Sequence, residues 1–327
     1  MSTVAHNTNR QNSACPRFRN PFDLADDEAY QRWRDAKLAA YPETAAELMV
    51  EIADPANPTE AERAAITRLC RKANMAIYVS RQEYPDPERI RRDLLAFAGA
   101  FELRRIEGHR SAKDDGIVAI EMASDKHRKG YIPYSNRPLS WHTDGYYNAP
   151  EDRIRSFILH CCRSAEQGGE NGLLDPEIAY IRLRDKNPEL ITALMHEGAM
   201  TIPANHEDNG KVRPESIGPV YTVDTRSGAL QMRYTARGRH IEWRDDPGTR
   251  EAVAFIASLL AGEEQRIFRH TLTPGQGVIC NNVLHSRTGF DGGSSSSAAS
   301  DRLLCRIRYL DPIAGTRHLD ESFQQQL

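Results

Sequence analysis

Six short segments with the composition of β-strands dominate the chain from about residue 116 onward. They are rich in aliphatic and aromatic side chains and are bounded by Gly, Pro, Asn or Asp. Their approximate bounds are 116–123, 156–162, 229–234, 266–272, 276–281 and 302–310. Many short strands separated by turns are typical of an antiparallel barrel or sandwich. The sequence therefore predicts a mainly β core.

Helical patterns precede and interrupt this β region. They begin with capping residues, and several place a proline at the first helical position, where its missing amide hydrogen is not needed. The patterns predict helices over about 60–73 and 87–99, a short strand over 76–79 between them, and helices that begin at Pro176, Pro188 and Thr249. The last helix is expected to bury Val253, Ile256, Ala257 and Leu260. Residues from about 21 to 110 thus form a helical shoulder, and the later helices are insertions.

Three segments are expected to be flexible or exposed. Residues 1–20 are rich in Asn, Ser, Arg and Thr and nearly lack aliphatic side chains, which predicts a flexible tail before a single domain over 21–327. The serine-rich stretch within 290–301 has the composition of a flexible loop. The polar stretch 205–219 is expected to be a second surface loop near the mouth of a site.

Bulk composition argues against several classes of partner. The chain has 43 Lys plus Arg against 46 Asp plus Glu, so its net charge of -3 offers no broad basic field for nucleic acid. No apolar run approaches the roughly 18 residues needed to cross a bilayer. The six cysteines form no C-x-x-C pair and the first residues lack an apolar signal core, which predicts a cytoplasmic protein. A homo-oligomer is left open.

Candidate metal ligands lie in two distant segments. In WHTDGYYN, a strand would place the side chains of His142 and Asp144 on one face, although an H-x-D tripeptide also occurs by chance on surface strands. The segment TPGQGVICNNVLHSRTGF has a turn and an apolar strand before His285. His160, His240 and His270 lack that context. An antiparallel barrel can join the two segments into a two-His, one-carboxylate set, which suits iron(II) with a 2-oxo acid and oxygen at the remaining positions.

The last β-prone segment, DRLLCRIRYLD, alternates arginines with apolar residues. One interpretation is a solvated strand face, since Arg is rarely buried without a partner. The other is that an inward Arg302 holds a carboxylate through two hydrogen bonds, as the far end of 2-oxoglutarate requires. Arg306 would lie ~13 Å further along the strand and could meet a second anion. Tyr146 and Tyr147 follow the H-x-D pair and are expected either to face the substrate or to pack in the core.

Together these segments resemble the iron(II)- and 2-oxoglutarate-dependent dioxygenases of the taurine dioxygenase type, which also include γ-butyrobetaine hydroxylase. The resemblance runs from about Ile77 to Tyr309 and rests on WHTDGYY, GGENGLLD, PGQGVICNNVLHSR and R-x-x-x-R. It implies a double-stranded β-helix, or jelly roll, with N-terminal helices and helical insertions. It also implies roles for individual residues: His142, Asp144 and His285 for iron, Arg302 and, in place of a family hydroxyl, Asn171 for 2-oxoglutarate, and Arg306 for an anionic group of the substrate.

The function implied is oxidation, most commonly hydroxylation, of a small polar and anionic molecule, with 2-oxoglutarate and oxygen converted to succinate and carbon dioxide. Two alternatives use the same residues differently. A zinc hydrolase could use the two-His, one-Asp set with a bound water, but it would leave the arginine pair unexplained. A non-catalytic jelly-roll protein could bind a metabolite or sense iron. The sequence does not identify the primary substrate.

Overall fold

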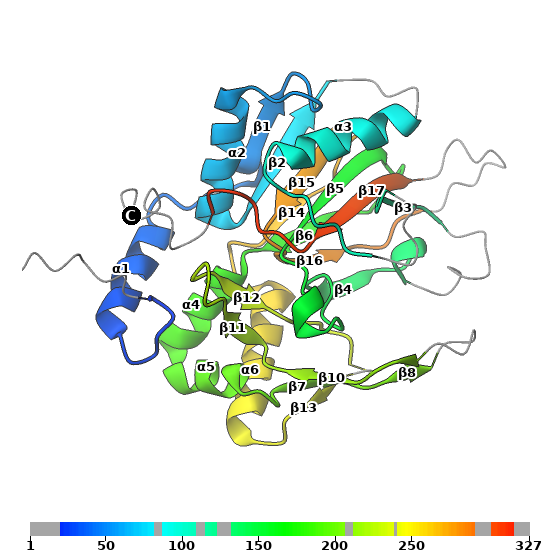
Figure 1. The fold of residues 1–327 in the computed structure, drawn as a ribbon. Coiled ribbons are helices and arrows are strands. Elements are labelled where there is room, and N and C mark those ends of the chain that lie inside the picture. Colours follow the sequence, from blue (N-terminus) through cyan, green and yellow to red (C-terminus); the bar gives the residue numbers. More distant parts are fainter. Residues whose placement is uncertain are drawn as a thin grey trace, which may run out of the picture.

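Two β-sheets form the centre of the protein. A computed structural model describes residues 20–81, 87–108, 115–122, 132–206, 212–238, 241–291 and 302–316. In the larger sheet the order is β1 (Met49–Ile52), β2 (Met75–Ser80), β15 (Gln276–Cys280), β5 (Ser156–Arg163), β17 (Leu303–Tyr309) and β3 (Val118–Ile120). In the smaller sheet it is β14 (Phe268–His270), β6 (Asn171–Leu174), β16 (Leu284–Arg287) and β4 (Leu139–His142). Figure 1 shows that strands distant in sequence lie side by side in both sheets.

The two sheets share one core. The buried side chains of Phe157 and Leu304 in the larger sheet and of Leu173 and Leu284 in the smaller one belong to a single cluster. All strand pairs in both sheets are antiparallel except the pair of β1 and β2. The predicted mainly β centre is therefore confirmed, and each of the six expected segments contains a strand, the third being β12 (Leu230–Met232).

The outer face of the larger sheet is covered by two helices, α2 (Glu60–Ala73) and α3 (Pro87–Gly99) (Figure 1). Ile66 of α2 and Phe97 of α3 pack in a second buried cluster with Ile307 of β17. The predicted bounds of α2 are correct because Thr59 and Glu62 form the expected capping box. The shoulder is not only helical, however: α1 (Asp27–Leu38) precedes it, and β1 and β2 belong to the larger sheet.

The remaining helices lie in a long insertion between β6 and β14, in the lower half of Figure 1. It contains α4 (Pro176–Lys186), α5 (Pro188–Met195), α6 (Pro247–Ser258), β7 (Met200–Ile202), β8 (Asn205–His206), β9 (Val212–Arg213), β10 (Ser216–Gly218), β11 (Tyr221–Val223) and β13 (Glu242–Trp243). Strand β7 pairs with β10 and β13, β8 with β9, and β11 with β12. The stretch 205–219 was expected to be a surface loop. Asn205 and residues 212–219 are exposed or partly buried, but the loop prediction is wrong for the described residues because they include β8, β9 and β10. Residues 207–211 lie outside the described residues.

The beginning of α6 also differs from expectation. Asp246 caps the helix by accepting a hydrogen bond from the Thr249 amide, and Pro247 is the first helical residue. The Asp-Pro pair here works like the Asp175-Pro176 pair that begins α4. With this start the helix buries Ala252 and Ile256, whereas Ala257, expected inside, is exposed.

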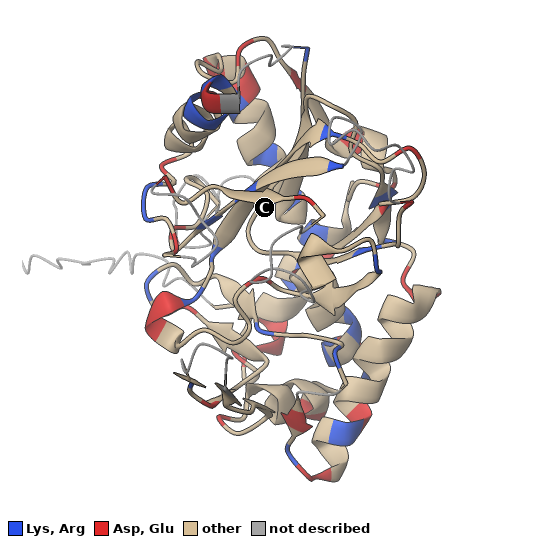
Figure 2. Cartoon of the chain, turned by 90° about the vertical axis from the view of Figure 1, so that its right-hand side faces the viewer, with Lys and Arg blue, Asp and Glu red and all other residues tan. Residues whose placement is uncertain are grey.

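Short helical turns complete the described chain: η1 (Ala45–Leu48), η2 (Ile132–Tyr134), η3 (Pro150–Asp152) and η4 (Leu259–Glu263). No helix in the described ranges has the length and hydropathy needed to cross a membrane. Figure 2 shows acidic and basic residues interspersed over the drawn chain. The predicted tail over 1–20 is described only at Asn20, and the serine-rich stretch 292–301 and His240 lie outside the described residues.

Candidate metal centre

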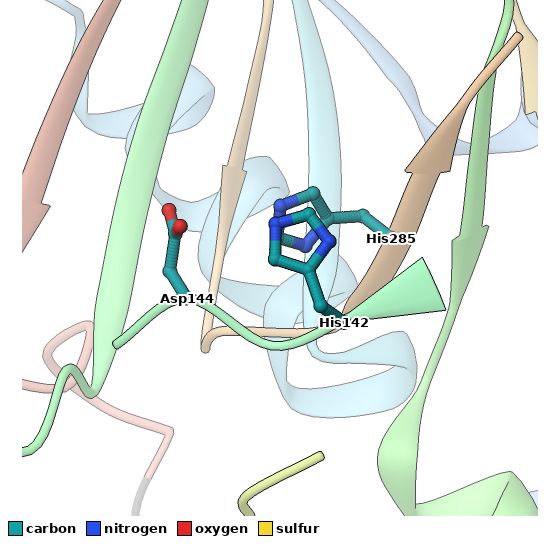
Figure 3. A group of neighbouring side chains, drawn as sticks. All are labelled: His142, Asp144 and His285. Carbon is teal, nitrogen blue, oxygen red and sulfur yellow. The ribbon is translucent and has the colours of Figure 1, made fainter. Parts of the chain in front are cut away.

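The structure brings His142, Asp144 and His285 together. His142 ends β4 and lies directly opposite His285 of β16 in the antiparallel register. One ligand atom of each residue lies within 4.8 Å of those of the other two. His142 and Asp144 are buried, and His285 is partly buried. Figure 3 shows the two imidazole rings side by side and the carboxylate across from them.

Asp144 does not lie on a strand, as the i, i+2 argument assumed. Strand β4 ends at His142, and Asp144 is in the turn that follows. Gly145, next in the turn, has a φ of 67°, a conformation that side chains with a Cβ rarely adopt. The turn, and not the alternation of a strand, brings the carboxylate toward the histidines.

Both histidines present the same nitrogen to the centre. Nδ1 of His142 lies 2.9 Å from the Ser140 carbonyl oxygen, and Nδ1 of His285 lies 2.9 Å from that of Val283. Because a carbonyl oxygen only accepts, Nδ1 carries the proton in each ring and Nε2 keeps its lone pair. Burial lowers the pKa of both rings, that of His142 to about 3, with the neighbouring His285 adding to the effect there. Both rings are therefore neutral at physiological pH.

The Asp144 carboxylate is ionised and oriented. Burial alone would raise its pKa, but the guanidinium groups of Arg306 and Arg308 outweigh burial and hold the pKa well below its usual range. Oδ1 accepts hydrogen bonds from Arg306 at 3.1 Å and from Arg308 at 3.4 Å. Oδ2 is buried and has no hydrogen-bond partner. One anionic oxygen thus remains available to a cation.

The main chain of the Asp144 turn is held by Asn282, which sequence reasoning did not identify. The Asn282 side-chain amide accepts from the Asp144 N–H at 2.8 Å and donates to the carbonyl oxygens of Asp144, at 3.0 Å, and Ile154, at 2.9 Å. Its φ is 47°, a left-handed conformation that Asn tolerates better than most residues. Because Asn282 lies between β15 and β16, it connects the Asp144 turn to the strand of His285. The Asn-Asn dipeptide after an apolar strand was the available signal for such a turn.

Arg306 and Arg308 of β17 are buried, and so is Arg302, the residue before this strand. The interpretation of these arginines as a solvated strand face is therefore wrong. Arg302, Arg306 and Arg308 are each less than 10% exposed. Arg306 contacts Asp144 through one terminal nitrogen, and its Nε is buried without a partner. Arg308 also forms an ion pair with Glu107 and donates to the Tyr147 hydroxyl at 3.4 Å. Strand alternation already placed Arg308 on this face, but sequence reasoning gave it no role.

Arg302 is accompanied by a second buried arginine, Arg287 of β16. Their guanidinium carbons lie 5.2 and 4.8 Å from the centre of the Phe290 ring. Arg287 donates to the carbonyl oxygens of Ser135, at 2.8 Å, and Arg137, at 2.6 Å. Among the described residues no carboxylate pairs with either arginine. Burial lowers the pKa of Arg302. Burial together with the charge of Arg302 lowers the pKa of Arg287 to about 10, so Arg287 remains a cation at neutral pH.

The glycine pair explains how the chain approaches Arg302. Gly168 and Gly169 have φ of 76° and 73°. A Cβ on Gly169 would lie 3.3 Å from Nε of Arg302, and one on Gly168 would lie 2.3 Å from a main-chain oxygen. Asn171, two residues further on, is opposite Arg287 in the register of β6 and β16, and its amide donates to the His270 carbonyl at 3.2 Å. The expected contact of Asn171 with 2-oxoglutarate remains a prediction.

The two tyrosines lie beside the histidines. The ring of Tyr146 is 6.3 Å from that of His142 and meets it edge-on, and Tyr147 packs edge-on against Tyr146 at 5.1 Å. Both are only partly buried. Of the other histidines, His160 bonds to a tyrosine hydroxyl at 3.0 Å and His270 to a glutamine oxygen at 2.8 Å, in agreement with structural roles.

Arg233 connects the insertion to this centre, and sequence reasoning did not identify it. Its guanidinium donates to the carbonyl oxygens of Tyr146, at 2.7 Å, Met200, at 2.9 Å, Ser216, at 2.6 Å, and Gly218, at 3.3 Å. Burial lowers its pKa to about 10. The guanidinium also donates to the Ser216 hydroxyl at 3.1 Å. An arginine whose contacts are mostly to main-chain oxygens has no sequence signature, because every residue has such an oxygen.

Residues 37–308 match the family model described as taurine catabolism dioxygenase, TauD/TfdA family. The chain belongs to the TauD/TfdA family. The expected resemblance is therefore confirmed. At the level of the family, the expectation of an oxygenase that depends on iron(II) and 2-oxoglutarate is confirmed as well.

Two sequence relatives and one solved structure are similar to parts of this chain. A uridine-5'-phosphate dioxygenase from Amycolatopsis sp is 29% identical over 160 residues, 46% of this chain and 54% of the relative. One from Streptomyces sp is 30% identical over 112 residues, 34% of this chain and 38% of the relative. The alignments thus span about half or less of these relatives. The structure of the non-heme iron oxygenase OrfP with iron, succinate and a hydroxy-arginine has a TM-score of 0.59 at 17% identity, covering 78% of this chain and 82% of OrfP. At this identity the likeness concerns the fold.

Proposed function

We propose that this protein binds iron(II) through Nε2 of His142, Nε2 of His285 and Oδ2 of Asp144. The observation that carries the proposal is that the three residues place ligand atoms within 4.8 Å of one another, with Oδ2 of Asp144 buried and without a partner, while Nδ1 of each histidine and Oδ1 of Asp144 are already held. Two imidazoles and one carboxylate on one face suit iron(II). An iron(II) ion held by these residues would supply the oxygen-activating chemistry for the oxidative decarboxylation of 2-oxoglutarate to succinate and carbon dioxide.

Arg302 anchors the distal carboxylate of 2-oxoglutarate in this proposal. A buried guanidinium without an acidic partner is costly, and a dicarboxylate supplies the missing charge. The support is its burial directly before β17, the strand that carries Arg306, together with the lack of a carboxylate partner among the described residues. Because residue 169 is a glycine, no Cβ crowds Nε of Arg302 at this turn.

The substrate we propose is a small anionic molecule that is hydroxylated. Arg306 has one terminal nitrogen on Asp144 and an Nε without a partner, so it can meet a second anion near the metal. Tyr146 and Tyr147 would flank the reacting carbon. The sequence relatives named for uridine 5'-phosphate suggest that a phosphate ester is one form of this anion, alongside carboxylates and sulfonates.

We further propose that the two sheets are the halves of a double-stranded β-helix, as in the family, and that the protein works in the cytoplasm. The antiparallel pairing of both sheets around one core supports the first statement. The five cysteines within the described residues are free thiols, the state that a reducing compartment preserves, which supports the second.

Metal-free protein tests the function. Adding iron(II) and 2-oxoglutarate in air should give slow succinate release, which a screen of small phosphates, carboxylates and sulfonates should stimulate. Zinc in place of iron should give no succinate. Zinc-dependent hydrolysis of a substrate would favour the hydrolase, and 2-oxoglutarate binding without any succinate would favour a non-catalytic protein.

A further inference from the structure

A second cation lies beside Arg302 in the part of the site where the proposed function places the far end of 2-oxoglutarate. Arg287 is two residues after His285 on β16, so its side chain lies on the same face of the strand as that histidine. It is buried, and it lies opposite Asn171 across the strand pair. The resemblance to the family gives Arg287 no role.

The two guanidinium groups share one neighbour and lack a counter-ion. Each guanidinium carbon is within 5.2 Å of the centre of the Phe290 ring, and the charge of Arg302 helps to lower the pKa of Arg287, so the two buried cations repel each other. No carboxylate among the described residues pairs with either, whereas the third and fourth buried arginines of this region, Arg306 and Arg308, both contact Asp144. An anion between Arg287 and Arg302 would relieve the repulsion.

Arg287 is also prevented from moving away. One terminal nitrogen donates to two carbonyl oxygens, those of Ser135 and Arg137, just before β4. Its Nε is buried and has no hydrogen-bond partner. A fixed cation with an unused donor is suited to an anion that arrives with a ligand.

We propose that Arg287 acts with Arg302 on the distal carboxylate of 2-oxoglutarate and so selects a dicarboxylic 2-oxo acid over a monocarboxylic one. This inference rests on the proposed role of Arg302. The competing explanation is that Arg287 only fixes the chain before β4 through its two carbonyl contacts. The two explanations differ in one respect: only the first depends on the charge of the ligand's far end.

The test is a binding measurement that needs no turnover. Protein loaded with manganese(II) is titrated without oxygen, by calorimetry, with 2-oxoglutarate and with 2-oxopentanoate, which has the same chain length but no distal carboxylate. Arg287→Met and Arg287→Gln are compared with the unmodified protein. The Gln variant keeps a donor for the chain before β4 but has no charge. We expect both variants to bind 2-oxoglutarate about 10- to 100-fold more weakly and 2-oxopentanoate within about twofold of the unmodified protein.

Arg184→Met is the matched control, because Arg184 is equally buried and donates to the carbonyl oxygens of Pro21 and Asp23 away from the centre. It should change neither affinity. Equal weakening of both ligands in the Arg287 variants, or no weakening at all, would overturn the inference. Arg302→Met separates the two proposals. If Arg302→Met selectively weakens the binding of 2-oxoglutarate and the Arg287 variants do not, only the inference about Arg287 is rejected. If Arg302→Met shows no selective weakening, the proposed anchor is rejected.

Discussion

Arg306 donates a hydrogen bond over 3.1 Å to Oδ1 of Asp144, the carboxylate oxygen beside the one that has no partner. The contact joins the strand of the arginines to the turn after β4, 162 residues earlier in the chain. It orients the carboxylate so that its other oxygen is left for a cation. The consequences can be measured residue by residue.

Replacing either histidine should remove the metal. We expect His142→Ala and His285→Ala to lose most bound iron, because two ligands on one face bind a divalent cation much more weakly than three. Iron per chain, measured after desalting, checks this. His270→Gln is the control, since His270 contacts Gln276 and not the centre. Full iron content in His285→Ala would place the third ligand elsewhere.

Arg306→Gln should separate substrate binding from metal binding. Arg308 still contacts Oδ1 of Asp144 in this variant, so iron content should stay near that of the unmodified protein. Background succinate release should persist, but its stimulation by an anionic substrate should be lost. Equal stimulation in both proteins would remove Arg306 from the substrate site.

The metal-free protein should lose stability as the pH falls from 7 to 5. The folded-state pKa of His142, about 3, lies below the ordinary value of 6.5, so the unfolded chain binds a proton in this range and the folded one does not. The contribution of His142 to the free energy of unfolding should therefore fall by about 2 kcal/mol between these pH values. Denaturant unfolding at both pH values measures it. His142→Gln should show a smaller loss, and an identical loss would mean that His142 titrates normally when folded.

Asn282 should matter to both stability and metal content. Asn282→Ala removes three hydrogen bonds and keeps a Cβ at a positive φ that Ala tolerates less well than Asn. We therefore expect a loss of about 2 to 3 kcal/mol in unfolding free energy and weaker iron binding. Asn282→Gly adopts this φ without strain and should be less destabilised than the Ala variant. Unfolding of the two variants side by side is the measurement. Unchanged stability in both would show that the amide contacts contribute nothing net.

Local patterns allowed much of the architecture to be predicted. The capping box at Thr59 fixed the beginning of α2, and the alternation in DRLLCRIRYLD identified β17. The pairing of His285 with His142 was expected only because a barrel can bring distant strands together. No local pattern specifies that β1 and β2 extend the larger sheet, since strand partners are chosen by long-range packing.

The predictions from sequence failed where a turn took the place of a strand and where the hydrogen-bond partner of a side chain is a main-chain atom. Asp144 was placed on a strand because i, i+2 spacing does not reveal where the strand ends. The burial of Arg302 could not be decided from its strand alone, because exposure depends on the opposing sheet. Arg287 and Arg233 contact carbonyl oxygens, which every residue has, so the sequence carries no trace of these bonds.

The contacts of Arg233 have a consequence for how the protein opens. One side chain connects Tyr146, in the turn beside the metal centre, to Met200, Ser216 and Gly218 in the insertion. Arg233 itself belongs to the insertion, so its bonds to Met200, Ser216 and Gly218 hold it within the insertion, and its bond to Tyr146 ties that unit to the turn. The two should therefore fluctuate as one cooperative unit. In hydrogen exchange, main-chain amides of β7 and of the Tyr146 turn would then become labelled together, at the rate of the shared opening.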